Sequence, residues 1–439
     1  MRRQVVFVLI LTGAVAIAAF VWLRSRPRPT NDMKALAERY VRLVLALGQH
    51  DPAFVDAYYG PAEWRVEAQH AKVPLTEVDA AATDLASDLD VIAPPASADE
   101  LVRWRHAYVA RQLEALRARV AMVRGTRLRF DEESKALYDA TSPQRDAAQF
   151  LAVLAELEAR LPGSGPLAER YETFRSRFVI PRDRLDATFR AAIDGCRSRT
   201  LKHIRMPSDE SFTVEYVSGK SWGAYNWYKG GYRSVIQVNT DLPIHADYAL
   251  VLACHEGYPG HHVYNALLEK NFVRDRRWPE FSVYALFSPQ SLIAEGTADF
   301  GIHVAFPGRE RVAFAQSVIF PAAGLDPATA ATYYEVADLA AKLDYAGDEA
   351  ARRYLDGQID AAGAAAWLEK YALYSRPRAE QRIRFFDEYR SYTINYTVGE
   401  DLVEQWVESR GGTESDPERR WEVFADLLSS PRLPSDLVR

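Results

Sequence analysis

The sequence predicts a mainly α-helical protein with a small β-hairpin or short sheet placed just before one buried helix. From Met33 onward, apolar residues recur at helical spacing in successive segments, and Pro or Gly residues separate these segments. Only residues 212–217 and 234–239 read as strands. A hydrophobic content of 48% over 439 residues is ample for a substantial core, in one large domain or two.

Residues 1–28 are predicted to be an N-terminal membrane anchor or signal segment, separate from the fold. The apolar run over residues 5–23 is about as long as a membrane-spanning helix requires, and arginines flank it on both sides. The triplet Ala-Ile-Ala at residues 16–18 would suit a signal-peptide cleavage site. We expect an uncleaved anchor with the remaining chain outside the cytoplasm, and a secreted protein if the segment is cleaved.

The remaining chain is expected to have two parts, a helical scaffold over residues 29–200 and a part with the functional site over residues 201–439. The break is placed between Arg182 and Ser211, because the two strand-like segments follow it. One continuous helical domain over residues 33–439 is the alternative. Residues 221–232, rich in glycine and aromatic side chains, predict a loop between the strands.

One short motif carries the chemistry of the chain. Three imidazoles and one carboxylate fall within eight residues, at the end of an apolar segment that reads as a buried helix. Imidazole is the commonest zinc ligand, and zinc peptidases begin their ligand motif with His-Glu on such a helix. The motif is Cys254-His255-Glu256-Gly257-Tyr258-Pro259-Gly260-His261-His262.

The spacing of the histidines requires a break in the helix. On a straight helix His255 and His261 point about 120° apart, so they would not share one ion. Pro259 cannot donate a backbone hydrogen bond, and Gly260 permits backbone conformations that other residues avoid. We therefore expect a kink or bulge at Pro-Gly that brings His261 back toward His255.

A third metal ligand is predicted at Glu295, within a run of small residues that would let a second helix lie close to the first. Two histidines and a glutamate, with a fourth position open to water, are typical of a catalytic zinc. Cys254 is interpreted as a small buried apolar residue. Since Cys196 is the only other cysteine, we expect no disulfide framework.

At these residues the chain resembles a known family. His-Glu-Gly-Tyr-Pro-Gly-His-His followed by Glu-Gly-x-Ala is similar to the signature of the bacterial family catalogued as domain of unknown function 885. The resemblance implies a large helical architecture like that of the gluzincins, a group of zinc metallopeptidases. It implies metal ligands at His255, His261 and Glu295 and a general base at Glu256. His262 is the alternative ligand, or a group that supports the site or faces the substrate.

Near the C-terminus the same family carries a tyrosine followed shortly by a glycine, and Tyr396-x-x-Gly399 matches that pattern. A phenol aimed at the metal would hydrogen-bond the oxyanion of a tetrahedral intermediate. An arginine in this region would suit a substrate carboxylate. Residues 235–239 are interpreted either as an edge strand that pairs with an extended substrate or as part of a structural hairpin.

The predicted function is that of a zinc-dependent hydrolase of peptide (amide) bonds. One Zn²⁺ on His255, His261 and Glu295 would activate water, Glu256 would take its proton, and Tyr396 would stabilise the oxyanion. The predicted partners are a peptide or small amide substrate and a membrane; a net charge of −6 with interspersed signs gives no nucleic-acid signal. The alternatives are a membrane-anchored, catalytically inactive metal-binding protein and a hydrolase of a non-peptide amide or ester.

Overall fold

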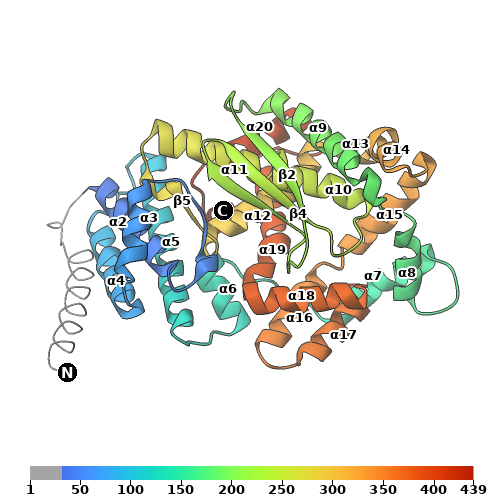
Figure 1. Ribbon diagram of the computed structural model, residues 1–439, viewed down its shortest axis with the longest axis horizontal. Helices are drawn as coiled ribbons and strands as arrows, with labels where there is room; N and C mark the ends of the chain where they lie inside the picture. The colour runs from blue at the N-terminus through green and yellow to red at the C-terminus, as the bar shows by residue number, and fades with distance from the viewer. Residues whose placement is uncertain (1–31, 439) are drawn as a thin grey trace, which may run out of the picture. The chain divides into compact units, whose positions relative to one another are not determined.

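The computed structural model describes residues 32–438, so the segment predicted over residues 1–28 lies outside the described residues. The described chain is mainly helical with two small sheets, which confirms the predicted fold class (Figure 1). No helix within residues 32–438 is long and apolar enough to cross a bilayer. The described chain divides into two compact units: residues 32–128, 269–290 and 431–433 form unit 1, and residues 129–268, 291–430 and 434–438 form unit 2.

Unit 1 is a group of packed helices with one two-stranded sheet. The apolar stripe of the first helix, which includes Leu36, Tyr40 and Leu43, is fully buried against the helices that follow. The two strands pair antiparallel, with Val55 opposite Ala285. Its elements are α2 (Met33–Leu47), η1 (Pro52–Phe54), β1 (Val55–Tyr58), α3 (Ala62–Ala71), α4 (Leu75–Val91), α5 (Glu100–Val123), η4 (Glu269–Asp275), η5 (Pro279–Ser282) and β5 (Val283–Ala285).

Unit 2 holds the predicted motif and a three-stranded sheet. It begins with α6 (Phe130–Tyr138), α7 (Ala147–Arg160), α8 (Leu167–Ser176), η2 (Arg182–Arg184), α9 (Leu185–His203), β2 (Ser211–Val217), β3 (Ala224–Gly230) and β4 (Arg233–Asn239). The motif spans α10 (Ala246–Leu252), η3 (Ala253–Gly257) and α11 (His261–Leu268). Residues 182–211, where the sequence places the break between the two predicted parts, lie inside this unit.

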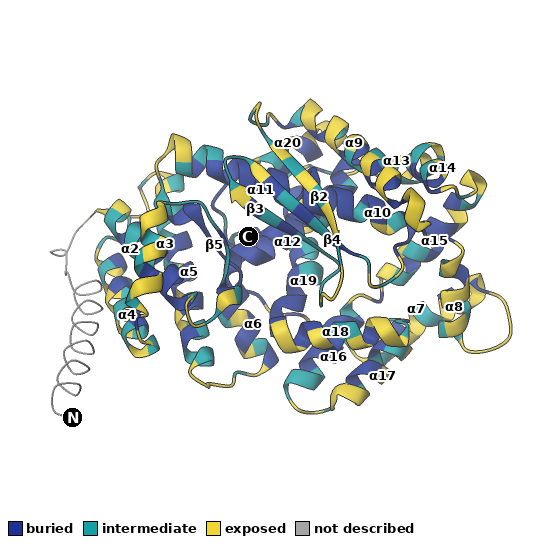
Figure 2. Cartoon of the chain, in the orientation of Figure 1, coloured by how far each residue is buried: buried dark blue, intermediate teal, exposed yellow. Residues whose placement is uncertain are grey.

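The rest of unit 2 is helical. Its elements are α12 (Pro289–Ala305), α13 (Arg309–Phe314), η6 (Ala315–Ile319), α14 (Phe320–Ala323), η7 (Pro327–Thr329), α15 (Ala330–Ala341), α16 (Tyr345–Leu355), α17 (Ala361–Tyr371), α18 (Arg376–Tyr389), η8 (Arg390–Thr393), α19 (Ile394–Ser409), α20 (Pro417–Leu428) and α21 (Pro434–Leu437). Helix α12 is buried almost all round, as Figure 2 shows, because most of its side chains are small or apolar. It is therefore a central helix of the unit. The polar exceptions on α12 are Gln290, Glu295, Asp299 and His303.

The sheet of unit 2 differs from the predicted hairpin by one strand. The strand order is β2-β4-β3, with β2 parallel and β3 antiparallel to β4. The segment predicted as a loop contains β3, because its aromatic residues alternate between buried (Tyr228) and half-exposed (Trp227) positions and favour a strand. Residues 235–239 belong to β4, which is paired on both sides. The edge-strand interpretation of these residues is therefore wrong, and the edge beside the motif belongs to β3.

An apolar core fixes the sheet against the helices of unit 2. Ile236 and Val238 of β4 pack with Phe189 of α9 and with Ala249 and Leu252 of α10. In Figure 1 the sheet accordingly lies beside α10 and α11. The core therefore places β3 next to the segment where α10 ends.

The two cysteines of the chain form a disulfide, contrary to the expectation from the sequence. Cys196 of α9 and Cys254 of η3 have Cα atoms 5.7 Å apart and are bonded. The sequence alone suggested that Cys254 is a small apolar residue of the core. The pairing depends on the fold, which brings α9 against the motif. The disulfide thus joins α9 to the residue that precedes His255.

We expect Cys196→Ser to lower the free energy of unfolding by about 2–4 kcal/mol, because the disulfide closes a loop over a separation of 58 residues and restricts the unfolded chain. Urea denaturation of the oxidised wild type and the variant measures this difference. Reductant should destabilise the wild type by the same amount and leave the variant unchanged. Equal stability of the two oxidised proteins would contradict the prediction.

Candidate metal centre

The motif interrupts its helix with a π-helical turn. Helix α10 continues into η3, the Tyr258–Pro259 peptide is cis, and α11 begins at His261. A Cβ at position 260 would lie 1.9 Å from the carbonyl oxygen of His255, so only glycine fits there. The predicted break at Pro259-Gly260 is confirmed, and the distortion already begins at Ala253.

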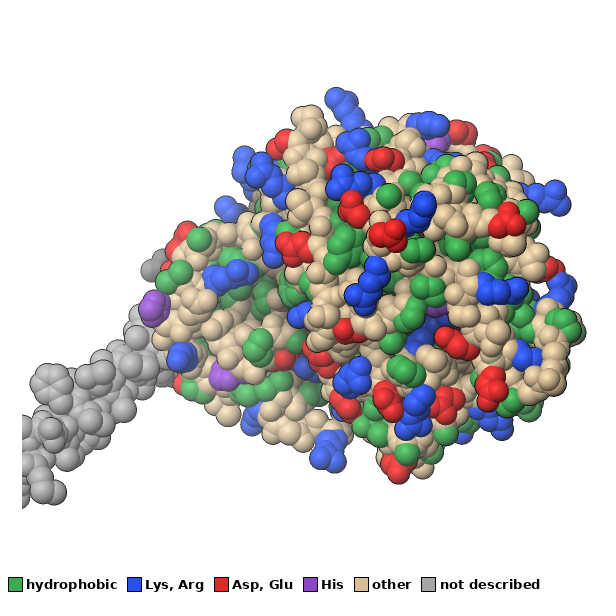
Figure 3. Space-filling model, turned by 45° about the vertical axis from the view of Figure 1, so that its right-hand side comes forward, with side chains coloured by type: hydrophobic (Ala, Val, Ile, Leu, Met, Phe, Trp, Pro, Cys, Tyr) green, Lys and Arg blue, Asp and Glu red, His purple; other side chains and the backbone are tan. Residues whose placement is uncertain are grey.

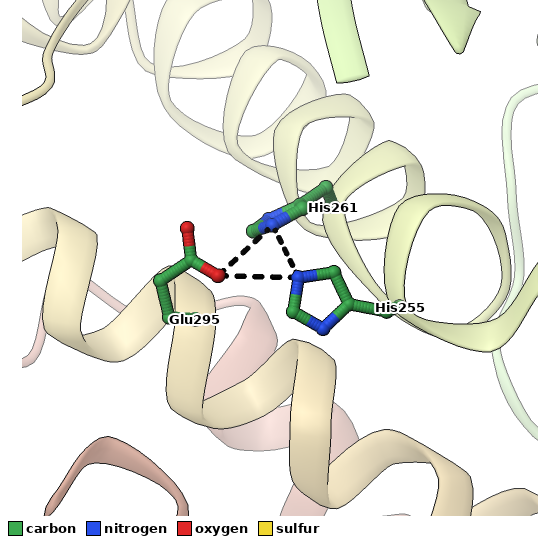
Figure 4. A group of neighbouring side chains, drawn as sticks. All are labelled: His255, His261 and Glu295. Carbon is green, nitrogen blue, oxygen red and sulfur yellow. Dashed lines mark hydrogen bonds and ion pairs between the residues drawn. The ribbon is translucent and has the colours of Figure 1, made fainter. Parts of the chain in front are cut away.

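The break brings the three predicted ligands together (Figure 4). The Nε2 atoms of His255 and His261 lie 3.1 Å apart, and Glu295 Oε2 lies 3.1 Å from the first and 3.4 Å from the second. A tetrahedral zinc with bonds of about 2.0–2.1 Å has ligand–ligand edges of roughly 3.3 Å. The three atoms thus form one face of a tetrahedron of the size that zinc requires.

The chemistry of these atoms also fits a cation. His255 donates its Nδ1–H to Asp299 Oδ1 over 2.7 Å, so Nε2 of the neutral ring carries a lone pair. That lone pair faces His261 Nε2 and a carboxylate oxygen. Glu295 Oε2 and Glu256 Oε2 are both buried and have no hydrogen-bond partner. Burial lowers the pKa of both histidines, but the carboxylates of Asp299 and Glu295 outweigh it for His255, and Glu295 outweighs it for His261, so both pKa values are raised. Electron-pair donors that converge in a buried site need a positive charge between them, which protons or a bound cation supply. The residues therefore fit a zinc ion.

Two further side chains orient the ligands. Asp299 sets the tautomer of His255, and Tyr392 donates its hydroxyl to Glu295 Oε1 over 2.6 Å, which leaves Oε2 toward the histidines. Sequence reasoning gave Asp299 no role, although it follows Glu295 by four residues and so lies on the same face of a helix. No signal in the sequence tied Tyr392 to Glu295.

Tyr392 belongs to a short turn that a buried carboxylate holds in place. Glu133, fully buried, accepts hydrogen bonds from Arg390 Nε (2.7 Å), Ser391 N (3.1 Å) and Ser391 Oγ (2.7 Å). Arg390 has φ +54°, an uncommon backbone conformation for a residue other than glycine. Such a conformation persists where surrounding contacts over-determine it. Glu133 supplies those contacts and so fixes η8 and the position of Tyr392.

Tyr396 lies beside the cluster at the start of α19. Its ring centroid is 6.3 Å from that of His255, at an interplanar angle of 29°. A Cβ on Gly296 would lie 2.3 Å from the backbone of Gly399, so α12 and α19 cross in close contact at these two glycines. Tyr396 precedes Gly399 by about one helical turn, and Glu295 is the neighbour of Gly296. The crossing at the two glycines therefore brings Tyr396 near Glu295. Its role toward an oxyanion stays a prediction.

The alternative ligand, His262, lies outside the cluster. For a neutral ring, Nε2 donates to Glu210 Oε2 over 3.0 Å and Nδ1 accepts from the Ser234 hydroxyl over 2.9 Å. Glu210 also accepts hydrogen bonds from Tyr258 and from Arg197. Both ring nitrogens of His262 are thus engaged behind the motif, where they link α11 to β4 and to the start of β2.

Glu256, the predicted general base, is buried at the end of η3. Burial raises the pKa of its carboxyl, and the neighbouring His255 opposes that rise. Its backbone carbonyl accepts a hydrogen bond of 2.6 Å from the Asn226 side chain of β3. The edge strand of the sheet is therefore tied to the residue that would take a proton.

Comparison with known proteins identifies no relative that bears on function. No protein-family model and no curated protein matches the sequence. Among solved structures, a candidate lipoprotein from Colwellia psychrerythraea aligns with 16% identity over 95% of this chain and 77% of that one, at a TM-score of 0.47. The M32 carboxypeptidase from Deinococcus radiodurans R1 aligns with 13% identity over 92% of this chain and 93% of that one, at a TM-score of 0.44. Likenesses this distant carry no inference, so the case for function rests on this chain's own residues.

We expect Asp299→Asn to weaken zinc binding by about 10- to 100-fold, because the ring of His255 loses its carboxylate partner. Tyr392→Phe should weaken it in the same direction. Competition with a chromogenic chelator measures both affinities. Asp338→Asn, on the exposed side chain that pairs with Arg311, is the matched control and should bind zinc like the wild type. Wild-type affinity in both test variants would contradict the proposed support of the ligands.

A pH dependence of stability is expected from Glu210. Burial alone would raise the pKa of this carboxyl, but hydrogen bonds from His262, Tyr258 and Arg197 outweigh it and lower the pKa to about 2. A depressed folded-state pKa stabilises the fold above the ordinary value of about 4.3, and this contribution is lost as the pH falls toward 2. Glu210→Gln should thus be less stable by about 1–3 kcal/mol at pH 7 and nearly equal to wild type at pH 2.

Denaturation of the zinc-free proteins between pH 2 and pH 7 measures the contribution of Glu210 without the metal. Glu418→Gln, on an exposed carboxylate of α20, is the control and should show no such dependence. A stability difference between Glu210→Gln and wild type that is the same at every pH would show that the ionised carboxylate contributes nothing.

Proposed function

We propose that this chain is a zinc-dependent hydrolase of peptide bonds and a member of the family that its motif resembles. The observation that carries the proposal is the triangle of His255 Nε2, His261 Nε2 and Glu295 Oε2, with sides of 3.1–3.4 Å, beside a buried and unpartnered Glu256 carboxylate oxygen. Three protein ligands with a fourth position open, next to a carboxylate, are typical of catalytic zinc sites.

A zinc ion on these three ligands would polarise the scissile carbonyl and lower the pKa of water in the site. Glu256 then takes a proton from the attacking water and gives it to the leaving amine, a role that suits a carboxylate whose pKa burial raises. Tyr396 donates its phenol hydrogen to the oxyanion, and burial together with the charge of Glu295 raises the pKa of Tyr396, which keeps this hydrogen in place at neutral pH.

The edge of β3 that faces away from β4 suits an extended peptide. Within the described residues β4 is the one strand that pairs with β3, so an added strand would pair on the other side of β3. Asn226 ties this strand to the carbonyl of Glu256. A peptide added along β3 would therefore lie next to the proposed general base.

The proposed location is outside the cytoplasm, with the N-terminal segment as a membrane anchor, or with secretion if that segment is cleaved. The apolar run over residues 5–23, flanked by arginines, supports this proposal. The disulfide between Cys196 and Cys254 supports it independently, because disulfides persist in oxidising compartments and are rare in the cytosol.

The central test measures metal content and turnover together. Wild type and His262→Ala should each hold about one zinc per chain, and His261→Ala should hold none. Glu256→Gln should keep its zinc and lose about 10²- to 10⁴-fold in kcat on a peptide library, because the proton acceptor is gone. Full activity of Glu256→Gln would disprove the mechanism. Zinc binding without hydrolysis of any peptide would favour a metal-binding protein or a hydrolase of another amide or ester.

A further inference from the structure

The face in Figure 3 carries acidic and basic side chains interspersed. One arginine of α18, Arg382, lies next to the candidate site and has no carboxylate in ion-pair contact within residues 32–438. Arg382 is half-buried. Its Nη2 donates to the Thr393 hydroxyl, and its Nε is buried without any acceptor. The carboxyls of Asp344 and Asp348 interact electrostatically with Arg382 but do not contact it as ion pairs, so no carboxylate of the described chain binds its guanidinium directly.

Several other arginines of the same unit are paired with carboxylates, although the half-buried Arg145 also has a buried Nε without an acceptor and forms no ion pair among the described residues. Arg390, Arg352 and Arg420 each form an ion pair with a glutamate. A guanidinium removed from water normally requires such a partner, because its desolvation is costly and its donors match carboxylates in pairs. Arg382 differs from Arg145 in lying beside Tyr396 and the candidate metal centre, so it is the incompletely satisfied arginine that an anionic group of a substrate would meet.

Arg382 lies close enough to the candidate metal centre for one substrate to reach both. Its Cζ lies 5.9 Å from the ring centroid of Tyr396, which lies 6.3 Å from the ring centroid of His255. Because both distances, 5.9 Å and 6.3 Å, are measured to the Tyr396 ring, the guanidinium and the His255 ring are at most about 12 Å apart. Burial and the charge of Glu295 raise the pKa of Tyr396, and Arg382 opposes that rise. Arg382 and Glu295 thus act on the same phenol with opposite charge.

A structural role for Arg382 is the competing explanation. Thr393 Oγ1 lies 3.4 Å from Asp348 Oδ1, so the hydroxyl connects the guanidinium to a buried carboxylate. Asp348 Oδ2, however, already accepts hydrogen bonds from Ser142 and Thr397. Asp348 therefore has its own donors and does not form an ion pair with Arg382.

We propose that Arg382 binds the C-terminal carboxylate of the substrate, so that the site acts as a carboxypeptidase; the inference rests on the proposed peptide hydrolysis. One water adds across the amide: its oxygen bonds to the carbonyl carbon, the C–N bond breaks, and the amine that leaves keeps the carboxylate. An extended peptide spans about 3.3–3.6 Å per residue. A limit of about 12 Å therefore allows a leaving fragment of at most about three residues.

The experiment compares one peptide sequence with a free C-terminal carboxylate and with a C-terminal amide. Zinc-loaded, full-length wild type should release fragments of one to three residues from the free acid and cleave the amide at least about tenfold less efficiently in kcat/KM. Arg382→Gln should raise KM for the free acid by about 10- to 100-fold and affect cleavage of the amide much less, and Arg382→Lys should restore part of the loss on the free acid. Arg384→Gln, on an exposed arginine of the same helix, is the matched control and should behave like wild type.

Binding gives a second readout that needs no turnover. In a Glu256→Gln background, the free acid should bind more tightly than the amide, and adding Arg382→Gln should abolish that difference. Zinc content and thermal midpoint of every variant are measured in parallel to detect misfolding.

The outcomes separate this inference from the proposed function. Hydrolysis of both peptides with equal efficiency, or at internal bonds regardless of the C-terminus, would overturn the inference and leave the hydrolase intact. An equal loss on acid and amide in Arg382→Gln would assign the residue a structural role and overturn it as well. If zinc-loaded wild type hydrolysed neither peptide nor any member of the library, both the proposed function and the inference would fail.

Discussion

The contact between Gly260 and the carbonyl groups of Cys254 and His255 is the constraint on which the rest of the site depends. A Cβ at position 260 would lie 1.9 Å from the His255 oxygen, so the chain turns back on itself as only glycine permits. The backbone hydrogen bond from Gly260 N to Cys254 O, 2.9 Å long, closes the turn. Without this return, two histidines six residues apart would point in different directions.

A second close backbone contact, between α12 and α19, brings Glu295 and Tyr396 to the histidines. Gly296 and Gly399 let α12 and α19 cross at backbone contact. Glu295 and Tyr396, which neighbour this crossing in the sequence, both lie close to His255. Glu133 and the turn η8 then position Tyr392 on the remaining oxygen of Glu295. Two glycine contacts and one buried carboxylate thus position residues that are distant in the sequence. The glycine of Tyr396-x-x-Gly399 has a packing role that explains its spacing from the tyrosine.

The charges of the assembled site determine which groups it can bind. Three carboxylates, of Glu256, Glu295 and Asp299, meet at two imidazoles, and burial opposes the ionised form of each acid. Such a site favours a divalent cation, while a substrate that brings its own negative charge needs a separate positive group. Arg382, one aromatic ring away, is placed to supply that charge. The cation site and the arginine together would distinguish the two ends of a bound peptide.

The sequence by itself determined the helical class, the break at Pro259-Gly260 and the ligand candidates, because these depend on local periodicity and on the backbone limits of proline and glycine. It left His261 and His262 as alternatives, since a choice between adjacent residues depends on the exact path of the turn. Tertiary structure brought His261 and not His262 to the cluster, paired Cys196 with Cys254, put β3 and not β4 at the edge of the sheet, and supplied the partners Asp299 and Tyr392. Each of these depends on which distant segments pack together, and the global fold rather than local sequence sets that packing.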